Sequence, residues 1–154
     1  MKDIKSTFVE KLHECNQHKK RLQLAKKNLE LIMPLTVDKY EKLTEVQASF
    51  IDQMIFRFSK MQDTVGDKLF PSFLELSGEN IKEKTFIDRL NRLEELNLVE
   101  KDEWMKLRKN RNEIAHEYPF NQDEVVESIN LIFNVTDKLI GIYDTFFKYC
   151  KEKV

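Results

Sequence analysis

Apolar residues recur along most of this chain at steps of three, four or seven, which is the spacing of one face of an α-helix. The first such stripe covers residues 4–32. Pro34 has no backbone N–H to donate and disfavours helix at Met33, so we expect the chain to break there. The pattern therefore predicts one long amphipathic helix at the N-terminal end of the chain.

A second long amphipathic helix is predicted to follow this break. Asp38, with Glu41 three positions later, marks its start as a capping box, and the helix is expected to end within residues 66–71. Its apolar stripe consists of Tyr40, Leu43, Val46, Phe50, Met54, Phe58, Met61 and Val65. Residues 71–84 have mixed polarity and are predicted to form a connection that has room for a short turn of helix.

Three further helices complete the prediction. They cover residues 86–96, capped by Asn97, then residues 102–115, and finally a long segment that opens with Asn121 and Glu124 as a capping box. The last helix is apolar around most of its circumference and needs cover on several sides. Its expected buried residues are Val125, Ile129, Ile132, Phe133, Leu139, Ile140, Phe146 and Phe147. We therefore predict an all-α antiparallel bundle of about five helices, in one domain over residues 1–154, with surplus apolar surface that faces a second copy of the chain.

Composition supports this class and narrows the compartment and the ligands. Only three glycines and three prolines occur, which favours long helices over a sheet. The formal net charge of −1 excludes the strong positive field of a protein that coats nucleic acid. Cys15 and Cys150 are expected to be small hydrophobic residues on helix faces, and no apolar segment resembles a signal peptide or a membrane span. We therefore expect a cytoplasmic protein, and we expect no cofactor. No metal site is expected either, because the spacing of His13, Cys15 and His18 scatters these side chains around a helix.

Residues 104–112 form a local basic window that contains four cations and no acid. One of the cations, Arg111, is in helical register with the apolar residues Trp104 and Leu107, an unusual place for a charge. Asn112 and His116 share a helix face, whereas Arg111 and His116 are about 140° apart on an ideal helix. Only a side chain as long as arginine brings both groups to one ligand.

Arg111, four residues, His116, one residue and Tyr118 form a pattern that resembles the RX4HXY motif of HepT-type toxins in the HEPN superfamily of helical ribonucleases. Asn112, directly after the arginine, also fits. The order of elements is similar too, because HEPN domains are helical bundles with the motif before a final long helix. The resemblance implies an endoribonuclease that cleaves RNA without a metal and acts as a homodimer, in which motifs of two subunits meet across a cleft.

The residues of the motif have readable chemical roles. A histidine that titrates near neutrality can take the proton of a ribose 2′-hydroxyl, so His116 is the expected general base. Arg111 would bind the scissile phosphate, and Asn112 would orient the phosphate or His116. The resemblance implies that Tyr118 is adenylylated by a minimal nucleotidyltransferase (MNT) antitoxin, which silences the nuclease. Contacts to the RNA backbone are expected from Lys106, Arg108 and Lys109, and Arg57 is a hypothetical second phosphate ligand.

Other interpretations of the same residues stay open at this point. His116 could cap the end of a helix, Arg111 could be salt-bridged in the core, and Arg57 could lay its stem over apolar neighbours. The chain could then be a non-catalytic substrate-binding subunit of a minimal nucleotidyltransferase, or a helical adaptor that uses no polar motif. Activity of the isolated protein discriminates the nuclease from the binding subunit, and an adaptor would keep its function in Arg111→Ala and His116→Ala.

Overall fold

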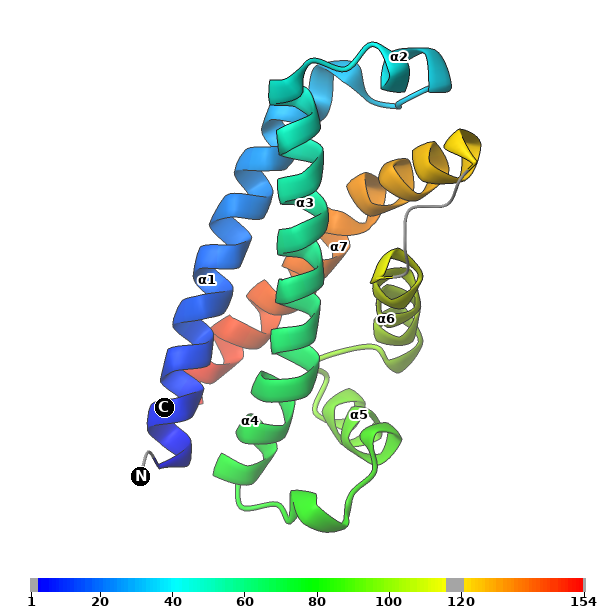
Figure 1. Cartoon of the computed structure of the whole chain (residues 1–154). Helices are drawn as coiled ribbons and strands as arrows, with labels where there is room; N and C mark the ends of the chain where they lie inside the picture. The colour runs from blue at the N-terminus through cyan, green and yellow to red at the C-terminus, as the bar shows by residue number, and fades with distance from the viewer. Residues whose placement is uncertain (1–2, 116–120, 154) are drawn as a thin grey trace.

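The computed structural model describes residues 3–115 and 121–153, and within these ranges every regular element is a helix (Figure 1). This confirms the all-α class. Six α-helices of seven residues or more occur in the described ranges, together with a shorter one and three helical turns of other types. The prediction of about five helices was therefore close but incomplete, and the difference arises in the second predicted helix.

The first helix, α1 (Ile4–Leu29), begins and ends much as its sequence predicts. The Asp3 carboxylate accepts a hydrogen bond of 2.7 Å from the Ser6 backbone N–H, which caps the first turn. A 3₁₀ turn, η1 (Glu30–Ile32), extends the helix up to the break before Pro34. The predicted boundary is confirmed.

The predicted second helix is instead two separate helices, α2 (Val37–Glu41) and α3 (Glu45–Thr64). The chain restarts at Thr44, whose hydroxyl accepts from the Gln47 N–H while the Gln47 side chain accepts from the Thr44 N–H. This reciprocal capping box fixes the start of α3. Val46, expected in the buried stripe, lies in the first turn of α3 and is 65% exposed.

The predicted end of the second helix within residues 66–71 was also wrong. A π-helical turn, η2 (Val65–Leu69), leads directly into α4 (Phe70–Leu76), which extends α3 beyond the expected stop (Figure 1). Pro71 lies in the first turn of α4, directly after this π-helical turn. Gly66 allows the close approach of Trp104, since a Cβ at that position would lie 3.0 Å from the indole ring.

The remaining elements follow the sequence prediction closely. After a 3₁₀ turn, η3 (Ile81–Glu83), come α5 (Phe86–Glu95), α6 (Lys101–Ala115) and α7 (Gln122–Lys153). Asn97 takes a positive φ of 60° after α5, as expected of a C-terminal cap. Asn121 accepts a hydrogen bond of 2.8 Å from the Asp123 N–H and so caps α7.

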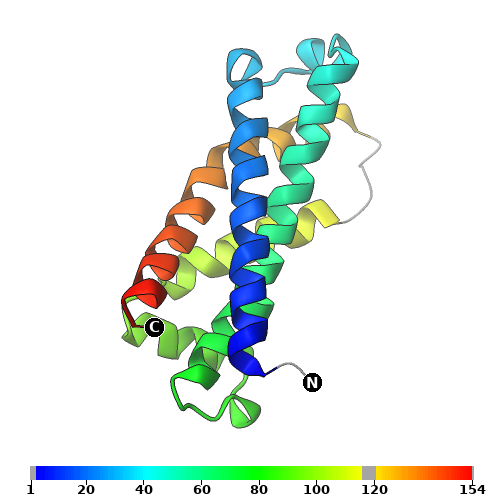
Figure 2. The same ribbon diagram turned by 90° about the vertical axis from the view of Figure 1, so that its left-hand side faces the viewer.

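The core lies where α7 crosses the long pair formed by α1 and α3. These two helices run antiparallel and make the broadest contact in the molecule, and α7 passes obliquely behind them (Figures 1 and 2). α7 also contacts α2 and α6, so the expected central helix does touch helices on several sides. Six of its eight predicted core residues are buried, and Phe133 and Phe147 are half-buried.

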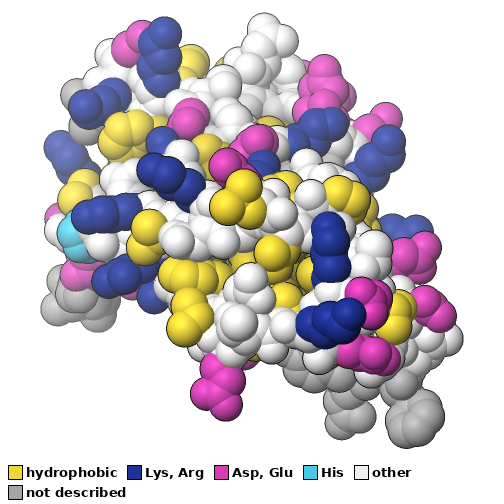
Figure 3. All heavy atoms as spheres, turned by 90° about the horizontal axis from the view of Figure 1, so that it is seen from above, with side chains coloured by type: hydrophobic (Ala, Val, Ile, Leu, Met, Phe, Trp, Pro, Cys, Tyr) yellow, Lys and Arg dark blue, Asp and Glu magenta, His cyan; other side chains and the backbone are white. Residues whose placement is uncertain are grey.

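One end of the molecule exposes apolar surface. Seen from above, hydrophobic side chains gather near the middle of this face, with charged side chains around them (Figure 3). The elements at this end are η1, α2 and the start of α3 (Figure 1), and they include Leu31, 98% exposed, and Val46. A contiguous apolar patch is typical of a surface that meets another molecule. Contact with a second copy of the chain stays a prediction.

Candidate functional site

Arg111 lies in the second half of α6, at the edge of the face that α6 turns toward the core. Leu107 and Trp104, one and two turns earlier on this face, are buried. The Arg111 side chain keeps 22% of its surface exposed. This is the half-buried position that the helical register indicates.

The guanidinium of Arg111 forms a two-pronged ion pair with Asp63 in the last turn of α3. Nε donates to Oδ1 at 3.0 Å, and Nη2 donates to Oδ2 at 2.8 Å. Two parallel hydrogen bonds fix the plane of the guanidinium as well as its place. Sequence analysis missed Asp63, because nothing in the sequence pairs two residues that lie 48 positions apart.

The ion pair uses two of the three guanidinium nitrogens of Arg111. Within the described part of the chain, no acceptor is bonded to Nη1 of Arg111. Since Asp63 balances the charge of Arg111, the pair as a whole adds no net positive charge to the site. A ligand anion must therefore be attracted mainly by other cations nearby.

Those cations lie along the neighbouring face of α6. An open groove of about 610 Å³ runs over this face and is lined by Met105, Lys106, Arg108, Lys109, Asn112 and Glu113. Lys106, Arg108 and Lys109 make no ion pair with any residue that the structure describes. Asn112 of the motif is exposed in the same groove. The structure thus places three cations of the basic window in one groove with Asn112, and Arg111 lies on the adjacent side of the helix.

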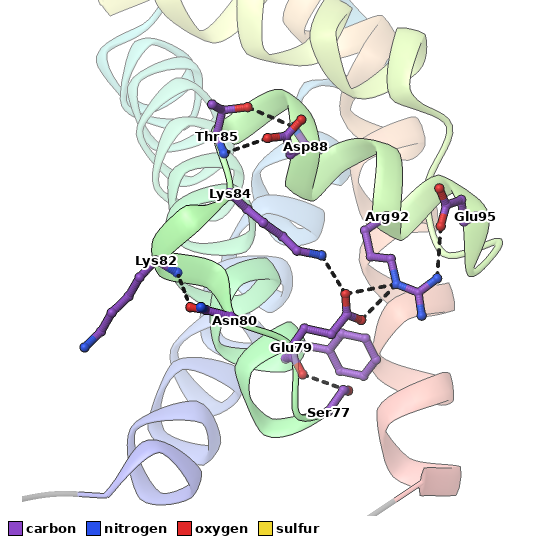
Figure 4. Close-up of polar contacts among 10 residues, drawn as sticks. Ser77, Glu79, Asn80, Lys82, Lys84, Thr85, Asp88, Arg92 and Glu95 are labelled. Carbon is purple, nitrogen blue, oxygen red and sulfur yellow. Dashed lines mark hydrogen bonds and ion pairs between the residues drawn. The ribbon is translucent and has the colours of Figure 1, made fainter.

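Arg108 is held over the ring of Phe86, the first residue of α5. Its guanidinium carbon lies 4.4 Å from the ring centroid, a close cation–π contact. The start of α5 is itself fixed by polar contacts (Figure 4). Thr85 and Asp88 form a capping box, and Glu79 accepts hydrogen bonds from both Lys84 and Arg92. The loop before α5 therefore holds Phe86 in place under α6.

Arg57 does not join this site. Its Nη1 donates a hydrogen bond of 2.9 Å to Nδ1 of His18, so the side chain reaches α1, and its guanidinium lies 5.3 Å from the ring of Phe56. These contacts do not bring Arg57 to Arg111, and a role of Arg57 as a phosphate ligand stays a prediction. Burial, and then the charge of Arg57, lower the pKa of His18.

His116 and Tyr118 lie outside the residues that the structure describes, and their roles stay predictions. α6 is described up to Ala115, and the chain is described again from Asn121.

Other features of the site bear on its chemistry. Among residues 3–115 and 121–153, no group of three or more His, Cys, Asp or Glu side chains is placed to hold a metal ion. Cys15 and Cys150 are buried and unpaired, and burial raises the pKa of each thiol to about 12. Both cysteines are therefore inert core residues, as predicted. No helix in the described part of the chain is long and apolar enough to cross a membrane.

A second groove, of about 750 Å³, lies at the start of α6 and has the opposite charge. It is lined by Glu94, Glu100, Asp102 and Glu103, with Lys138 as its cation. Carboxylates in this number repel a polyanion. The groove at the start of α6 is therefore acidic, and the groove farther along α6 is mainly basic.

Comparisons with protein families, with curated proteins and with solved structures found no match to this chain. The assignment to a function therefore rests on the residues themselves and on their placement.

Proposed function

We propose that this chain is a HEPN-type endoribonuclease, the RNA-cleaving toxin of a toxin–antitoxin pair. One observation carries the proposal. The motif formed by Arg111, Asn112, His116 and Tyr118 falls around the end of α6, directly before the longest helix, and its arginine is a half-buried guanidinium held in a fixed plane beside a basic groove. A prearranged cation next to a positively charged surface is what a phosphate site requires.

In the proposed reaction, the 2′-hydroxyl of a ribose attacks the adjacent phosphate. His116 takes the proton of the 2′-hydroxyl, a bond forms between the 2′-oxygen and phosphorus, and the bond from phosphorus to the 5′-oxygen breaks. The 5′-oxygen takes a proton from water and leaves. The products are a 2′,3′-cyclic phosphate and a 5′-hydroxyl end, and no metal ion takes part.

Arg111 stabilises the charge that gathers on the phosphate oxygens in the transition state. Since Asp63 occupies Nε and Nη2, the phosphate meets the guanidinium through Nη1. Asp63 lowers the net attraction of the site for RNA but keeps Arg111 from turning away. Lys106, Arg108 and Lys109 supply the attraction for the RNA backbone.

Two partners belong to this proposal. A second copy of the chain would bring a second motif to the same cleft, and a nucleotidyltransferase of the MNT type would transfer AMP to Tyr118. The added phosphate places negative charge and bulk next to Arg111 and His116, which neutralises a site built for phosphate. Adenylylated protein should therefore lose activity, and Tyr118→Phe should escape this inhibition.

Cleavage of RNA by the purified protein in the presence of EDTA tests the function. Wild type should produce cyclic phosphate ends, and His116→Ala and Arg111→Ala should each lose at least about a hundredfold in rate, as expected for a general base and for a transition-state ligand. His13→Ala and Arg21→Ala, at exposed positions of α1, are the matched controls and should cleave like wild type. Full activity of His116→Ala would refute the mechanism.

The ion pair between Arg111 and Asp63 favours one alternative, a non-catalytic substrate-binding subunit of a minimal nucleotidyltransferase. An arginine whose charge is already balanced can simply join α3 to α6. In that case the isolated protein leaves RNA intact under every condition, and a partner transferase shows higher activity in its presence. The cleavage assay therefore separates the two functions.

A further inference from the structure

We propose that the groove along α6 binds an unpaired RNA base, stacked on the guanidinium of Arg108 and read at its edge by Asn112. This inference rests on the proposed function for the choice of RNA as ligand. It gives Arg108 a different role from that of Lys106 and Lys109, because a stacking residue recognises a base and a lysine recognises a phosphate.

The first step of the argument is the stack of Arg108 on Phe86. A guanidinium is planar and has two faces, and its central carbon in Arg108 lies over the ring of Phe86, 4.4 Å from the ring centroid. The side chain of Arg108 is exposed and lines the groove. Its uncovered face is therefore available to a flat, electron-rich ring, and nucleobases stack on arginine planes in single-stranded RNA complexes.

The second step is the rigidity of this platform. Phe86 follows the capping box of Thr85 and Asp88 at the start of α5 (Figure 4). Glu79 holds the loop before it through Lys84, at 2.8 Å, and through Arg92. A platform that is fixed before the ligand arrives spends little entropy on binding.

The third step is the composition of the groove. Met105, Arg108 and Asn112 are three and four positions apart, so they form one stripe along α6. Met105 offers apolar surface, and the amide of Asn112 offers an NH₂ group that donates beside a carbonyl oxygen that accepts, the pair that adenine matches best. The volume of about 610 Å³ lies within the usual range of small-molecule sites.

The fourth step is the position of this stripe relative to Arg111. Asn112 is the next residue along the helix, and consecutive residues of a helix point about 100° apart. A base bound by Arg108 and Asn112 and a phosphate bound by Arg111 would therefore lie on adjacent sides of α6. A base in a duplex is covered on both faces by its neighbours, so the groove selects single-stranded RNA.

Binding to labelled RNA tests the inference in the full-length His116→Ala protein, which holds RNA without the proposed cleavage. The probes are a short, adenine-containing single strand with a fluorescein label and the duplex of the same sequence, followed by fluorescence anisotropy. Arg108→Lys keeps the charge and loses the plane, and should weaken single-strand binding roughly tenfold while duplex binding changes less than about twofold. Phe86→Leu should weaken the single strand in the same direction.

Lys109→Gln is the matched control for charge, and it should weaken single strand and duplex by the same factor. Equal affinity of Arg108→Lys and its parent for the single strand, or an equal loss on both probes, would overturn the inference. Failure of the parent protein to bind both the single strand and the duplex would overturn it as well.

If wild type fails to cleave RNA but Arg108→Lys selectively loses the single strand, the base site stands and the nuclease function fails. If wild type cleaves and Arg108→Lys binds normally, the reverse holds.

Discussion

The two halves of α6 use the same helix face in different ways. Near its start, Trp104 is completely buried, with its ring 4.9 Å from that of Phe70 and its edge against Gly66. Two turns later the same face carries Arg111, which is partly exposed and paired with Asp63. The first half secures the helix to the core by packing, and this allows the second half to carry a charge where the core ends. Packing around Trp104 therefore positions Arg111, although Arg111 itself lies outside the packed part of the helix.

The largest expected effect comes from the packed half. Trp104→Ala removes the whole indole and leaves a cavity between α6 and η2, so we expect a loss of about 3–5 kcal/mol in the free energy of unfolding. Trp104→Phe keeps a ring near Phe70 and should cost less. Urea denaturation followed by far-ultraviolet circular dichroism measures both, because Trp104 is the one tryptophan in the chain and fluorescence would be lost with it. A loss below about 1 kcal/mol for Trp104→Ala would contradict the packing described here.

The paired half should contribute much less to stability. A double-mutant cycle of Asp63→Asn and Arg111→Met should give a coupling of about 1 kcal/mol, because both side chains keep some contact with water. Asp67→Asn, at an exposed position of η2, is the control for the change in net charge and should alter stability by less than about 0.5 kcal/mol. A coupling energy as large as the cost of Trp104→Ala would mean that the two halves of α6 contribute equally to the free energy of unfolding, which would contradict the comparison.

The smallest effect concerns a second polar contact of α3, the one between Arg57 and His18. Burial and the Arg57 charge lower the pKa of His18 below its ordinary 6.5, so the unfolded chain binds this proton more readily than the folded chain. The contribution of His18 to stability is thus complete above pH 6.5 and is lost as the pH falls from there through the lower pKa of the folded state.

The melting temperature, measured across this pH range, should therefore fall less steeply as the pH is lowered in His18→Gln than in wild type. His13→Gln, on the exposed side of α1, should keep the wild-type profile. Identical profiles for His18→Gln and wild type would show that His18 titrates alike in the folded and unfolded chain.

The long helices could be predicted from the sequence because their apolar residues keep one period over many turns. This holds for α1, α6 and α7, and Asn97 gave the end of α5 correctly. The restart at α3 was missed although its signal is local, since Thr44 and Gln47 form a capping pair three positions apart. The end predicted within residues 66–71 was wrong, because a π-helical turn and a proline in the first turn of α4 let the chain continue as helix.

The candidate site could be predicted only in part. The register of Arg111 with Trp104 and Leu107 placed it correctly at the edge of the buried face. Its partner Asp63 could not be inferred, because a long-range ion pair depends on how two helices dock and leaves no periodic signal. The contact of Arg108 with Phe86 was missed for the same reason. A single sequence reveals which face a side chain occupies, but not which residue it meets there.

One side-chain amide of α7 binds the loop after η1, which lies 95 positions earlier in the sequence. Asn130 donates to the Leu35 carbonyl at 2.9 Å and accepts from the Leu35 N–H at 2.8 Å, so its side chain satisfies both backbone polar groups of one residue after η1. On a ribosome, the hairpin of α1 and α3 emerges long before residue 130. Its connecting loop therefore stays hydrogen-bonded to water until the last helix arrives, and a nascent chain cut short before α7 should present that loop to proteases.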